Sequence, residues 1–400
     1  MAEQVKLALV GCGGISGAHV SGYKDLYKRG CRDLVYTACL DVSEVSAKRR
    51  AVELAEIQGS APAVFTRVED LLSSGLAEAG DLCLPHFLHH SMAISLLEGG
   101  MHALVEKPLG ITVRASRKMI EAARKAKRVL ATAENIRRYS WARSGRWAVS
   151  QAKLAGDIVA ADITNVAYGP FDVNNPAFKW RLVKLLVGGG MIMDSGAHFT
   201  DMMLYLFGEP EEVYCSMSTT DTRVVQGVPI LGSVPADVED SWHAVIKFAQ
   251  GPLVTWTYSR AYPGPLLRHG RYYGTKGLIE DNGFPFHCFQ SGCTVHLGDN
   301  TYLTREEVLA AYKNSLSEPE KDRLFPYGCE DGFGIQLWDF AEAIKTGRQP
   351  ELDGEAGLKA KALCEACYES AFANEPVKYT DVLSGKIHAY QQPIDEYWNL

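Results

Sequence analysis

The sequence lacks the features of a membrane, secreted or nucleic-acid-binding protein. Its apolar runs fall well short of the roughly 20 residues that a helix needs to cross a bilayer. The first residues, Met1 to Lys6, carry neither the basic start nor the apolar stretch of a secretory signal. Acidic residues outnumber basic ones by 48 to 41, and no basic tail offsets the net charge of −7. We therefore expect a cytoplasmic protein without nucleic-acid or membrane partners.

The sequence also lacks the cysteine pattern of a disulfide framework. Its ten cysteines are irregularly spaced in a chain of 400 residues, which is long enough to bury extensive cores. Cys364 and Cys367 have the spacing of a redox motif, but they fall within an alanine-rich helical segment, so we expect buried, reduced thiols. Four other residues are too irregularly spaced for a structural zinc site: His287, Cys288, Cys293 and His296. We predict no metal.

What the first part of the chain does have is a regular alternation of short apolar runs and amphipathic segments. Strands are expected at 6–10, 34–40, 63–65, 81–84, 103–105 and 129–133. Helices are expected at 15–28, 43–57, 67–75, 88–99 and 112–127. This alternation predicts an α/β fold in which residues 1–137 form a Rossmann domain with a doubly wound parallel sheet.

The pattern changes beyond residue 137. Longer β-like stretches are found at 157–169, 211–219, 241–249 and 252–262. Helices are expected at 192–207, 304–315, 332–346 and 355–373. We predict that residues 138–400 form an α+β domain with a large open, mainly antiparallel sheet, interrupted by an insertion at 278–331.

A glycine-rich turn follows the first strand and opens the first helix. It consists of Gly11, Cys12, Gly13, Gly14 and Ile15. Ser16 stands where the dinucleotide-binding fingerprint has its third small residue, and the turn has the strand-to-helix context that gives this motif its meaning. The N-terminus of the helix would attract the pyrophosphate of a dinucleotide through its free N–H groups and its dipole.

Asp41 ends the second strand and bears on the choice of cofactor. A carboxylate at this position can accept hydrogen bonds from ribose hydroxyls and repels a 2′-phosphate. The nearby Lys48, Arg49 and Arg50 are interpreted as the solvated face of a helix. We predict NAD as the cofactor, with NADP as the less favoured alternative.

Two further clusters contain residues suited to catalysis. The fifth strand runs into Glu106–Pro108, which places Lys107 where the strands of a doubly wound sheet line a ligand crevice. Gly188–Gly190, which would let the backbone pass close to a ligand, precede Asp194 and His198. The last two are four residues apart and would share one face of a helix, where the carboxylate could orient the ring. A surface lysine, a helix-capping aspartate and a core histidine remain alternatives.

In this order, the motifs resemble those of the Gfo/Idh/MocA family, the glucose–fructose oxidoreductase, inositol dehydrogenase and rhizopine-catabolism oxidoreductases. The resemblance covers nearly the whole chain and also includes His19, Pro85–His89, Ala133–Asn135 and the spacing of Gly274 and Gly277. It implies a nucleotide-binding domain followed by a large open sheet that often forms an oligomer interface. We therefore expect a homo-oligomer, a dimer or a tetramer, formed through the C-terminal sheet.

The resemblance implies that Lys107, Asp194 and His198 are catalytic. His198 would be the general base for the reacting hydroxyl, Asp194 would orient it or contact the sugar, and Lys107 would polarise the hydroxyl. These roles agree with the chemistry, because hydride loss from a carbinol needs a proton acceptor of near-neutral pKa and a cation that stabilises the alkoxide.

The resemblance also implies binding roles for other residues. Beside the glycine turn and Asp41, the expected cofactor-binding residues are Pro85, His86, His89, Glu106, Lys107 and Asn135. Beside the catalytic residues, the expected substrate-binding residues are Arg137, Trp180 and Tyr262. One position departs from the family, which commonly has asparagine where His86 stands.

We therefore predict an NAD(P)-dependent oxidoreductase that transfers a hydride between the nicotinamide and a secondary hydroxyl of a sugar, cyclitol or glycoside. A redox-neutral glycosidase of the same family, which oxidises its substrate transiently, eliminates the aglycone and reduces the product again, is an alternative. A noncatalytic nucleotide-sensing protein is a second alternative.

Overall fold

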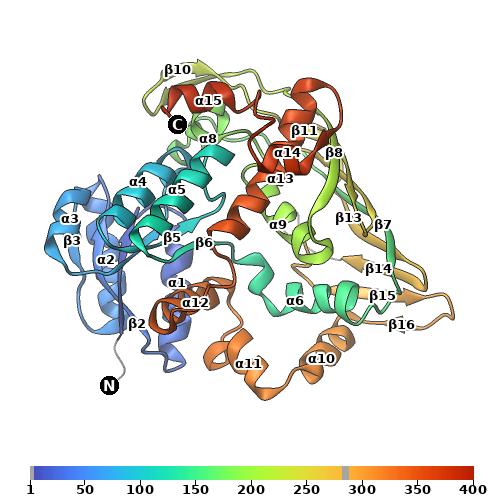
Figure 1. The fold of residues 1–400 in the computed structure, drawn as a ribbon, viewed down its shortest axis with the longest axis horizontal. Helices are drawn as coiled ribbons and strands as arrows, with labels where there is room; N and C mark the ends of the chain where they lie inside the picture. Colours follow the sequence, from blue (N-terminus) through green and yellow to red (C-terminus); the bar gives the residue numbers. More distant parts are fainter. Residues whose placement is uncertain (1–3, 282–287) are drawn as a thin grey trace. The chain divides into compact units, whose positions relative to one another are not determined.

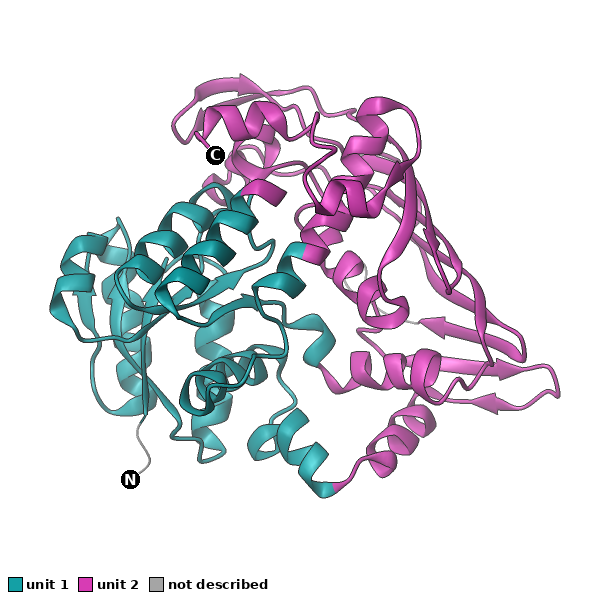
Figure 2. Cartoon of the chain, in the orientation of Figure 1, with its two compact units in different colours: residues 1–111, 115–138, 318–358 teal, residues 112–114, 139–317, 359–400 magenta. Residues whose placement is uncertain are grey.

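A computed structural model of the chain describes residues 4–281 and 288–400. The chain divides into two compact units, coloured teal and magenta in Figure 2. Unit 1 comprises residues 1–111, 115–138 and 318–358, and unit 2 comprises residues 112–114, 139–317 and 359–400. The chain passes from unit 1 to unit 2 after residue 138, and residues 318–358, which the sequence pattern placed in the second domain, lie in unit 1.

Unit 1 is built on a six-stranded parallel sheet with the order β3-β2-β1-β4-β5-β6 (Figure 1). The strands are β1 (Val5–Val10), β2 (Leu34–Leu40), β3 (Ala63–Phe65), β4 (Ala79–Leu82), β5 (His102–Glu106) and β6 (Leu130–Ala133). The connecting helices are α1 (Ser16–Lys28), α2 (Glu44–Gln58), α3 (Val68–Ser74), α4 (His86–Glu98) and α5 (Val113–Ala126). This is the predicted doubly wound Rossmann order, and every element begins and ends within two residues of its expected position.

The strands of unit 1 are continuous apolar runs because both faces of the sheet are covered. Along β1, Leu7 and Leu9 point to one face and Ala8 and Val10 to the other, and all four are buried. Since all six strands are parallel, the carboxyl ends of β1, β2, β4, β5 and β6 lie along one edge of the sheet. The residues expected to bind the cofactor follow directly after these ends.

Residues 318–358 contain α11 (Glu318–Leu324) and α12 (Gly332–Thr346). The second of these helices packs directly on α1. A Cβ atom added to Gly22 would lie 2.5 Å from the backbone nitrogen of Gly334, so the two helices approach backbone to backbone. Because of this contact, residues 318–358 pack with unit 1. The hydrophobic periodicity of the sequence does not reveal such a contact between distant segments.

Unit 2 is built on a nine-stranded sheet with the order β16-β15-β14-β13-β7-β12-β11-β8-β17. Its strands are β7 (Ile158–Val166), β8 (Pro210–Ser218), β11 (Ser241–Phe248), β12 (Leu253–Ser259), β13 (Leu267–Gly274), β14 (Gly277–Asp281), β15 (Cys293–Leu297), β16 (Tyr302–Leu303) and β17 (Val377–Lys378). The pair β12–β7 is parallel and the other neighbours are antiparallel, so the predicted mainly antiparallel sheet is confirmed. Strands β9 (Val224–Val228) and β10 (Gly232–Pro235) form a separate pair.

Unit 2 also contains α-helices of different lengths. They are α6 (Ser140–Arg146), α7 (Pro176–Lys179), α8 (Lys184–Val187), α9 (Gly196–Phe207), α10 (Arg305–Ser315), α13 (Gly354–Ala373), whose residues 354–358 lie in unit 1, α14 (Tyr379–Leu383) and α15 (Gln392–Tyr397). The sheet alternates in burial: along β11, Trp242, Ala244 and Ile246 are buried, whereas His243 and Val245 are exposed. One face therefore carries the core of unit 2 and the other is open, as the alternation in the sequence predicted.

The expected insertion at 278–331 contributes strands to the main sheet. Strands β14, β15 and β16 extend the main sheet, and α10 follows with a capping box formed by Thr304 and Glu307. In β15, Cys293 is buried and His296 is exposed, so these two residues of the discounted zinc cluster do not share a face. His287, another member of that cluster, lies outside the described residues.

The ten cysteines are buried and free, in agreement with the prediction. Cys364 and Cys367 both lie within α13, and the thiol of Cys364 donates to the carbonyl oxygen of Ile192 at 3.4 Å. Among the described residues, no helix combines the length and the apolarity needed to span a bilayer.

Candidate functional site

The end of β1 and the start of α1 form an open cradle at the carboxyl edge of the unit 1 sheet. Gly11 has φ +88°, and a Cβ atom there would lie 2.5 Å from the carbonyl oxygen of Cys83, so the position requires glycine. Gly13 and Gly14 are exposed, and a Cβ atom on either would meet open space. The first turn of α1 has neither a side-chain cap nor an acidic residue to compensate its dipole. This geometry fits the pyrophosphate of a dinucleotide.

Asp41 lies beside the cradle at the end of β2. Its carboxylate accepts the N–H of Cys12 at 2.7 Å and the N–H of Ser43 at 2.8 Å. The side chain is half-buried, and each carboxylate oxygen has a second lone pair for a ribose hydroxyl. The position therefore suits the ribose-binding role predicted from the sequence.

The arginines that follow Asp41 in α2 do not form a simple solvated face. Arg49 donates to the carbonyl oxygen of Cys12 at 2.9 Å, and Arg50 donates to the carbonyl oxygen of Gly13 at 2.9 Å. Sequence reasoning missed these contacts because helix periodicity does not show how far an arginine side chain reaches. Two guanidinium groups therefore border the glycine turn, close to the carboxylate of Asp41.

Lys107 directly follows β5 and is half-buried. The residue before it, Glu106, belongs to a buried triad of charged groups with His19 and Asp81. The Nε2 atom of His19 lies 2.8 Å from Glu106 Oε1, and its Nδ1 atom lies 2.9 Å from Asp81 Oδ1. Tyr36 also donates to Asp81, at 2.7 Å. Burial acts to lower the pKa of His19, but the charge of Asp81 outweighs it and holds that pKa well above its usual value. A carboxylate oxygen thus faces each ring nitrogen, an arrangement that favours the imidazolium form of His19.

One ring nitrogen of His19, a carboxylate oxygen of Asp81 and the thiol of Cys83 lie within 4.8 Å of one another, a spacing that a metal ion could use. The His19 nitrogens, however, contact carboxylate oxygens directly at hydrogen-bond distance. Burial also raises the pKa of the Cys83 thiol to about 12, which disfavours the thiolate that metals bind. The close contacts in this cluster are therefore interpreted as hydrogen bonds and ion pairs and not as bonds to a metal ion.

The histidines after β4 differ in their surroundings. Pro85 precedes α4, and His86 is its first residue and is buried. His89 is fully buried, and its two ring nitrogens lie 2.9 Å from the carbonyl oxygen of Pro108 and 2.8 Å from that of Leu84. Burial lowers the pKa of His89. His89 therefore connects the turn after β4 with the turn after β5.

Beyond β6, two neighbouring arginines have different environments. Asn135 is buried and Arg137 is half-buried. Arg138 is buried and forms an ion pair with Asp339 at 3.0 Å, so it is a structural residue of unit 1. Of the pair, Arg137 remains the candidate for contact with a ligand.

In unit 2, Asp194 and His198 lie at the start of α9 but do not share a helical face. The helix begins at Gly196, and the residues from 191 to 195 form turns, so the predicted helix over 192–207 is shorter than expected. Asp194 accepts a hydrogen bond from Arg181 at 3.0 Å, and this guanidinium lies 4.4 Å over the ring of Trp180. His198 is buried in the first turn of α9.

The turn before α9 is bound by the buried carboxylate of Glu239. This carboxylate accepts the N–H groups of Gly190 at 2.7 Å and Ile192 at 2.9 Å, and Tyr368 donates to it at 2.8 Å. Burial raises the pKa of Glu239 to about 7, although these hydrogen bonds act to lower it. Glu239 therefore anchors the turn that leads to Asp194 through two of its backbone N–H groups.

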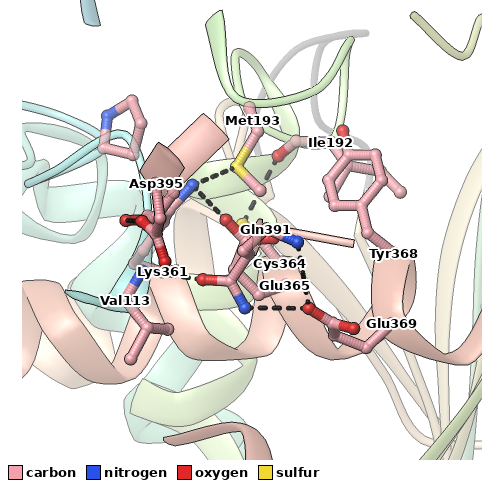
Figure 3. Close-up of polar contacts among 12 residues, drawn as sticks. Val113, Ile192, Met193, Lys361, Cys364, Glu365, Tyr368, Glu369, Gln391 and Asp395 are labelled. Atoms are coloured by element: carbon pink, nitrogen blue, oxygen red, sulfur yellow. Dashed lines mark hydrogen bonds and ion pairs between the residues drawn. The ribbon is translucent and has the colours of Figure 1, made fainter. Parts of the chain in front are cut away.

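Helix α13 supports the same segment from its buried side (Figure 3). Lys361 forms a fully buried ion pair with Glu365 at 2.6 Å, and its ammonium also contacts the sulfur of Met193 at 3.0 Å. Cys364 and Tyr368, one and two turns further along, contact Ile192 and Gly190. Sequence analysis gave these residues no role, since α13 shows only an amphipathic pattern.

A cavity of about 500 Å³ lies within unit 2 beside this segment. Its lining includes Met191 and Leu182, which adjoin the Asp194 turn and Arg181, together with Phe171, Arg260 and Tyr168. Tyr262, predicted to bind substrate, is half exposed after β12, and its neighbours Ala261 and Pro263 line the cavity in its place.

Comparison with known proteins agrees with this geometry. Residues 5–134 match the model of an oxidoreductase family described as the NAD-binding Rossmann fold. Residues 149–379 match the model of the C-terminal alpha/beta domain of the same oxidoreductase family. The two matches together cover both units of the chain.

Individual relatives include enzymes that act on sugars. The chain is 26% identical to levoglucosan dehydrogenase of Pseudarthrobacter phenanthrenivorans, over 73% of this chain and 77% of that protein. It is 29% identical to 1,5-anhydro-D-fructose reductase of Ensifer adhaerens, over 76% of this chain and 81% of that protein. A solved structure of levoglucosan dehydrogenase in complex with NADH superposes with a TM-score of 0.74 at 22% identity, covering 94% of this chain and 99% of that one.

Proposed function

The chain belongs to the Gfo/Idh/MocA oxidoreductase family, and from this premise we propose that it transfers a hydride between NAD and a secondary hydroxyl of a sugar, cyclitol or glycoside. One observation carries the proposal: the open glycine turn and Lys107 follow parallel strands of one sheet and so lie along the same edge. A dinucleotide cradle and a fixed ammonium group at one edge suit the oxidation of a carbinol.

The residues of the cradle fit NAD. The Gly11–Ile15 turn and the uncapped start of α1 would hold the pyrophosphate, and Asp41 would accept the ribose hydroxyls. When bound, the nicotinamide supplies the redox chemistry. The guanidinium groups of Arg49 and Arg50 border the turn, so we propose NAD as the preferred cofactor with residual acceptance of NADP.

The chain's own side chains supply the proton chemistry of the proposed reaction. Lys107 donates a hydrogen bond to the reacting hydroxyl and stabilises the negative charge that develops on its oxygen. His198 accepts the hydroxyl proton, and Asp194, oriented by Arg181, contacts the sugar beside it. Arg137 and Trp180 complete the proposed substrate contacts.

The test measures reduced cofactor with a panel of monosaccharides, cyclitols and glycosides. We expect NADH to accumulate in a one-to-one ratio with oxidised product; product without NADH would instead support the redox-neutral glycosidase. Lys107→Met and His198→Asn should each lower kcat by roughly 10²- to 10⁴-fold while NAD affinity, measured by calorimetry, stays close to that of the wild type. Lys153→Met, which removes an exposed lysine of unit 2, serves as the control. Turnover like that of the wild type in both site variants would contradict the assignment.

We further propose that the open face of the nine-stranded sheet joins copies of the chain into a dimer or tetramer. Tyr214, Val245, Leu253 and Tyr273 are exposed large apolar side chains on four of its strands. Substitution Val245→Asp places a charge at the centre of this face and should shift the mass measured by light scattering toward the monomer. An unchanged mass for a wild-type oligomer would place the interface elsewhere.

A further inference from the structure

We propose that the cavity of unit 2 binds an anionic group of the substrate, a carboxylate or a phosphate, through the guanidinium of Arg260. This inference rests on the function proposed above, because it names the chemical class of the sugar that the enzyme would take. It concerns a residue for which neither the family match nor the named relatives state a role.

Arg260 directly follows β12 and is fixed at the cavity wall. Its backbone N–H donates to the carbonyl oxygen of Asp240 at 3.0 Å. In the side chain, Nη2 donates to the carbonyl oxygen of Gly169, and Nη1 contacts the sulfur of Met191 at 3.4 Å. The guanidinium carbon lies 3.9 Å over the ring of Phe171. The cation is therefore held in place by neutral groups alone.

The charge of Arg260 has no counter-ion at contact distance. Among the residues that the structure describes, no carboxylate oxygen forms an ion pair with it. Burial lowers the pKa of Arg260, while the more distant charges of Tyr258, Asp194 and Asp240 act to raise it. Holding a half-buried cation without a carboxylate partner is unfavourable, and a bound anion would supply the missing charge. The planar fork of a guanidinium matches both carboxylate and phosphate oxygens.

The carboxylates that line the same cavity already have donors. Asp221 pairs with Arg223 at 2.6 Å. Asp240 accepts the hydroxyl of Thr220 at 2.6 Å as well as backbone N–H groups of the same loop. Glu239 is directed to the N–H groups beneath the Asp194 turn. Arg223 also lines the cavity, but its charge is paired with Asp221, and three of its five N–H groups are used on Asp221 and on the carbonyl oxygen of Phe171. Arg260 has used two of its five N–H donors and pairs with no carboxylate that the structure describes, so it is the lining cation with the most capacity left for an anion.

The cavity lies beside residues that the proposed reaction uses. Met191 lines it three residues before Asp194, and Leu182 lines it next to Arg181, the partner of Asp194. Its volume of about 500 Å³ falls within the usual range of small-molecule sites. The exposed ring of Tyr168 offers an apolar face to the carbon atoms of a sugar ring. A sugar whose anionic group reaches Arg260 would therefore pass close to Asp194.

The test measures binding to the full-length protein by isothermal titration calorimetry, with and without NAD. The probes are glucose, glucuronate, glucose 6-phosphate and inorganic phosphate, so the two acids distinguish a carboxylate from a phosphate. We expect at least one anion to bind tighter than glucose, and Arg260→Gln to weaken that binding by roughly 10- to 100-fold. Arg260→Lys should retain part of the affinity. Arg271→Gln, which removes an exposed arginine paired with Glu280 outside the cavity, should bind as the wild type does.

Three results would overturn the inference: no binding of any of the three anions, equal affinity for anions and glucose, or equal affinity of Arg260→Gln and wild type. Circular dichroism of each variant shows whether it is folded. If Arg260→Gln is unfolded, the affinity of Arg260→Lys is compared with that of the wild type instead.

A different result would refute the proposed function. If anions bind through Arg260 but no substrate yields NADH, the oxidoreductase assignment is refuted while the anion site stands.

Discussion

Replacing His19 with glutamine should destabilise unit 1 strongly, because it removes the positive charge from a buried triad. In the native protein the imidazolium lies between Asp81 and Glu106 at 2.9 and 2.8 Å, with both carboxylates buried. Removing one partner from a buried ion pair costs about 3–5 kcal/mol, since the remaining charges lose their compensation. Tyr36→Phe provides a matched control. It removes one hydrogen bond from an uncharged donor to the Asp81 carboxylate, at a cost of about 1.5–3 kcal/mol, and leaves the His19 ring in place.

The sign of the pH dependence follows from the raised pKa of His19. The stabilisation by the imidazolium is fully present below the unfolded-state value of about 6.5 and is lost as the pH rises through the folded-state value. The difference in unfolding free energy between wild type and His19→Gln should therefore be larger at pH 7 than at pH 9. The cost of Tyr36→Phe should not follow this trend.

Urea denaturation at pH 7 and pH 9, followed by circular dichroism and tryptophan fluorescence, measures these free energies. The ¹⁵N chemical shifts of the His19 ring report independently whether both nitrogens are protonated at pH 7. A neutral ring, a loss of stability below 1 kcal/mol in His19→Gln, or a loss that grows with pH would refute the imidazolium assignment.

Three further predictions concern the proposed cofactor and substrate residues. Gly11→Ala introduces a Cβ atom 2.5 Å from the carbonyl oxygen of Cys83 and should abolish NAD binding in calorimetry; wild-type affinity would contradict the cradle. Asp41→Ala should lower kcat/KM for NAD and raise the ratio of NADP to NAD use by about tenfold, the effect of one lost charge-assisted hydrogen bond; an unchanged ratio would mean that another residue contacts the ribose. Glu239→Gln replaces an acceptor of two N–H groups and should lower kcat at least tenfold with NAD affinity unchanged; equal loss of both would indicate a general loss of structure.

The architecture of both units could be predicted because it depends on local patterns. In unit 1, strands such as Leu34–Leu40 are apolar runs bounded by turns, and their spacing by helices leaves the parallel sheet as the consistent arrangement. In unit 2, the alternation along Ser241–Phe248 identified a sheet with one open face. The motif residues were located for the same reason, since Gly11, Asp41 and Lys107 each follow a strand whose end the sequence marks.

The predictions that failed depended on contacts between distant parts of the chain. The helix at 332–346 was identified correctly, but its docking on α1 depends on Gly22 and Gly334, which are 312 residues apart in a sequence that shows no pairing between them. The helix expected from residue 192 begins at Gly196. The turn before it is bound by the distant Glu239, whose carboxylate accepts the N–H groups of Gly190 and Ile192. A local sequence pattern does not show contacts of this kind.

Gly188–Gly190 show how a correct motif can have a different physical cause from the one expected. The sequence suggested that these glycines let the backbone approach a ligand. In the structure, a Cβ atom on Gly189 would lie 2.2 Å from the hydroxyl oxygen of Tyr368, and one on Gly190 would lie 2.3 Å from the carbonyl oxygen of Glu239. The close approach at these two positions is therefore to buried protein groups. Since those groups fix the turn that leads to Asp194, the glycines would act on the proposed reaction through the placement of that carboxylate.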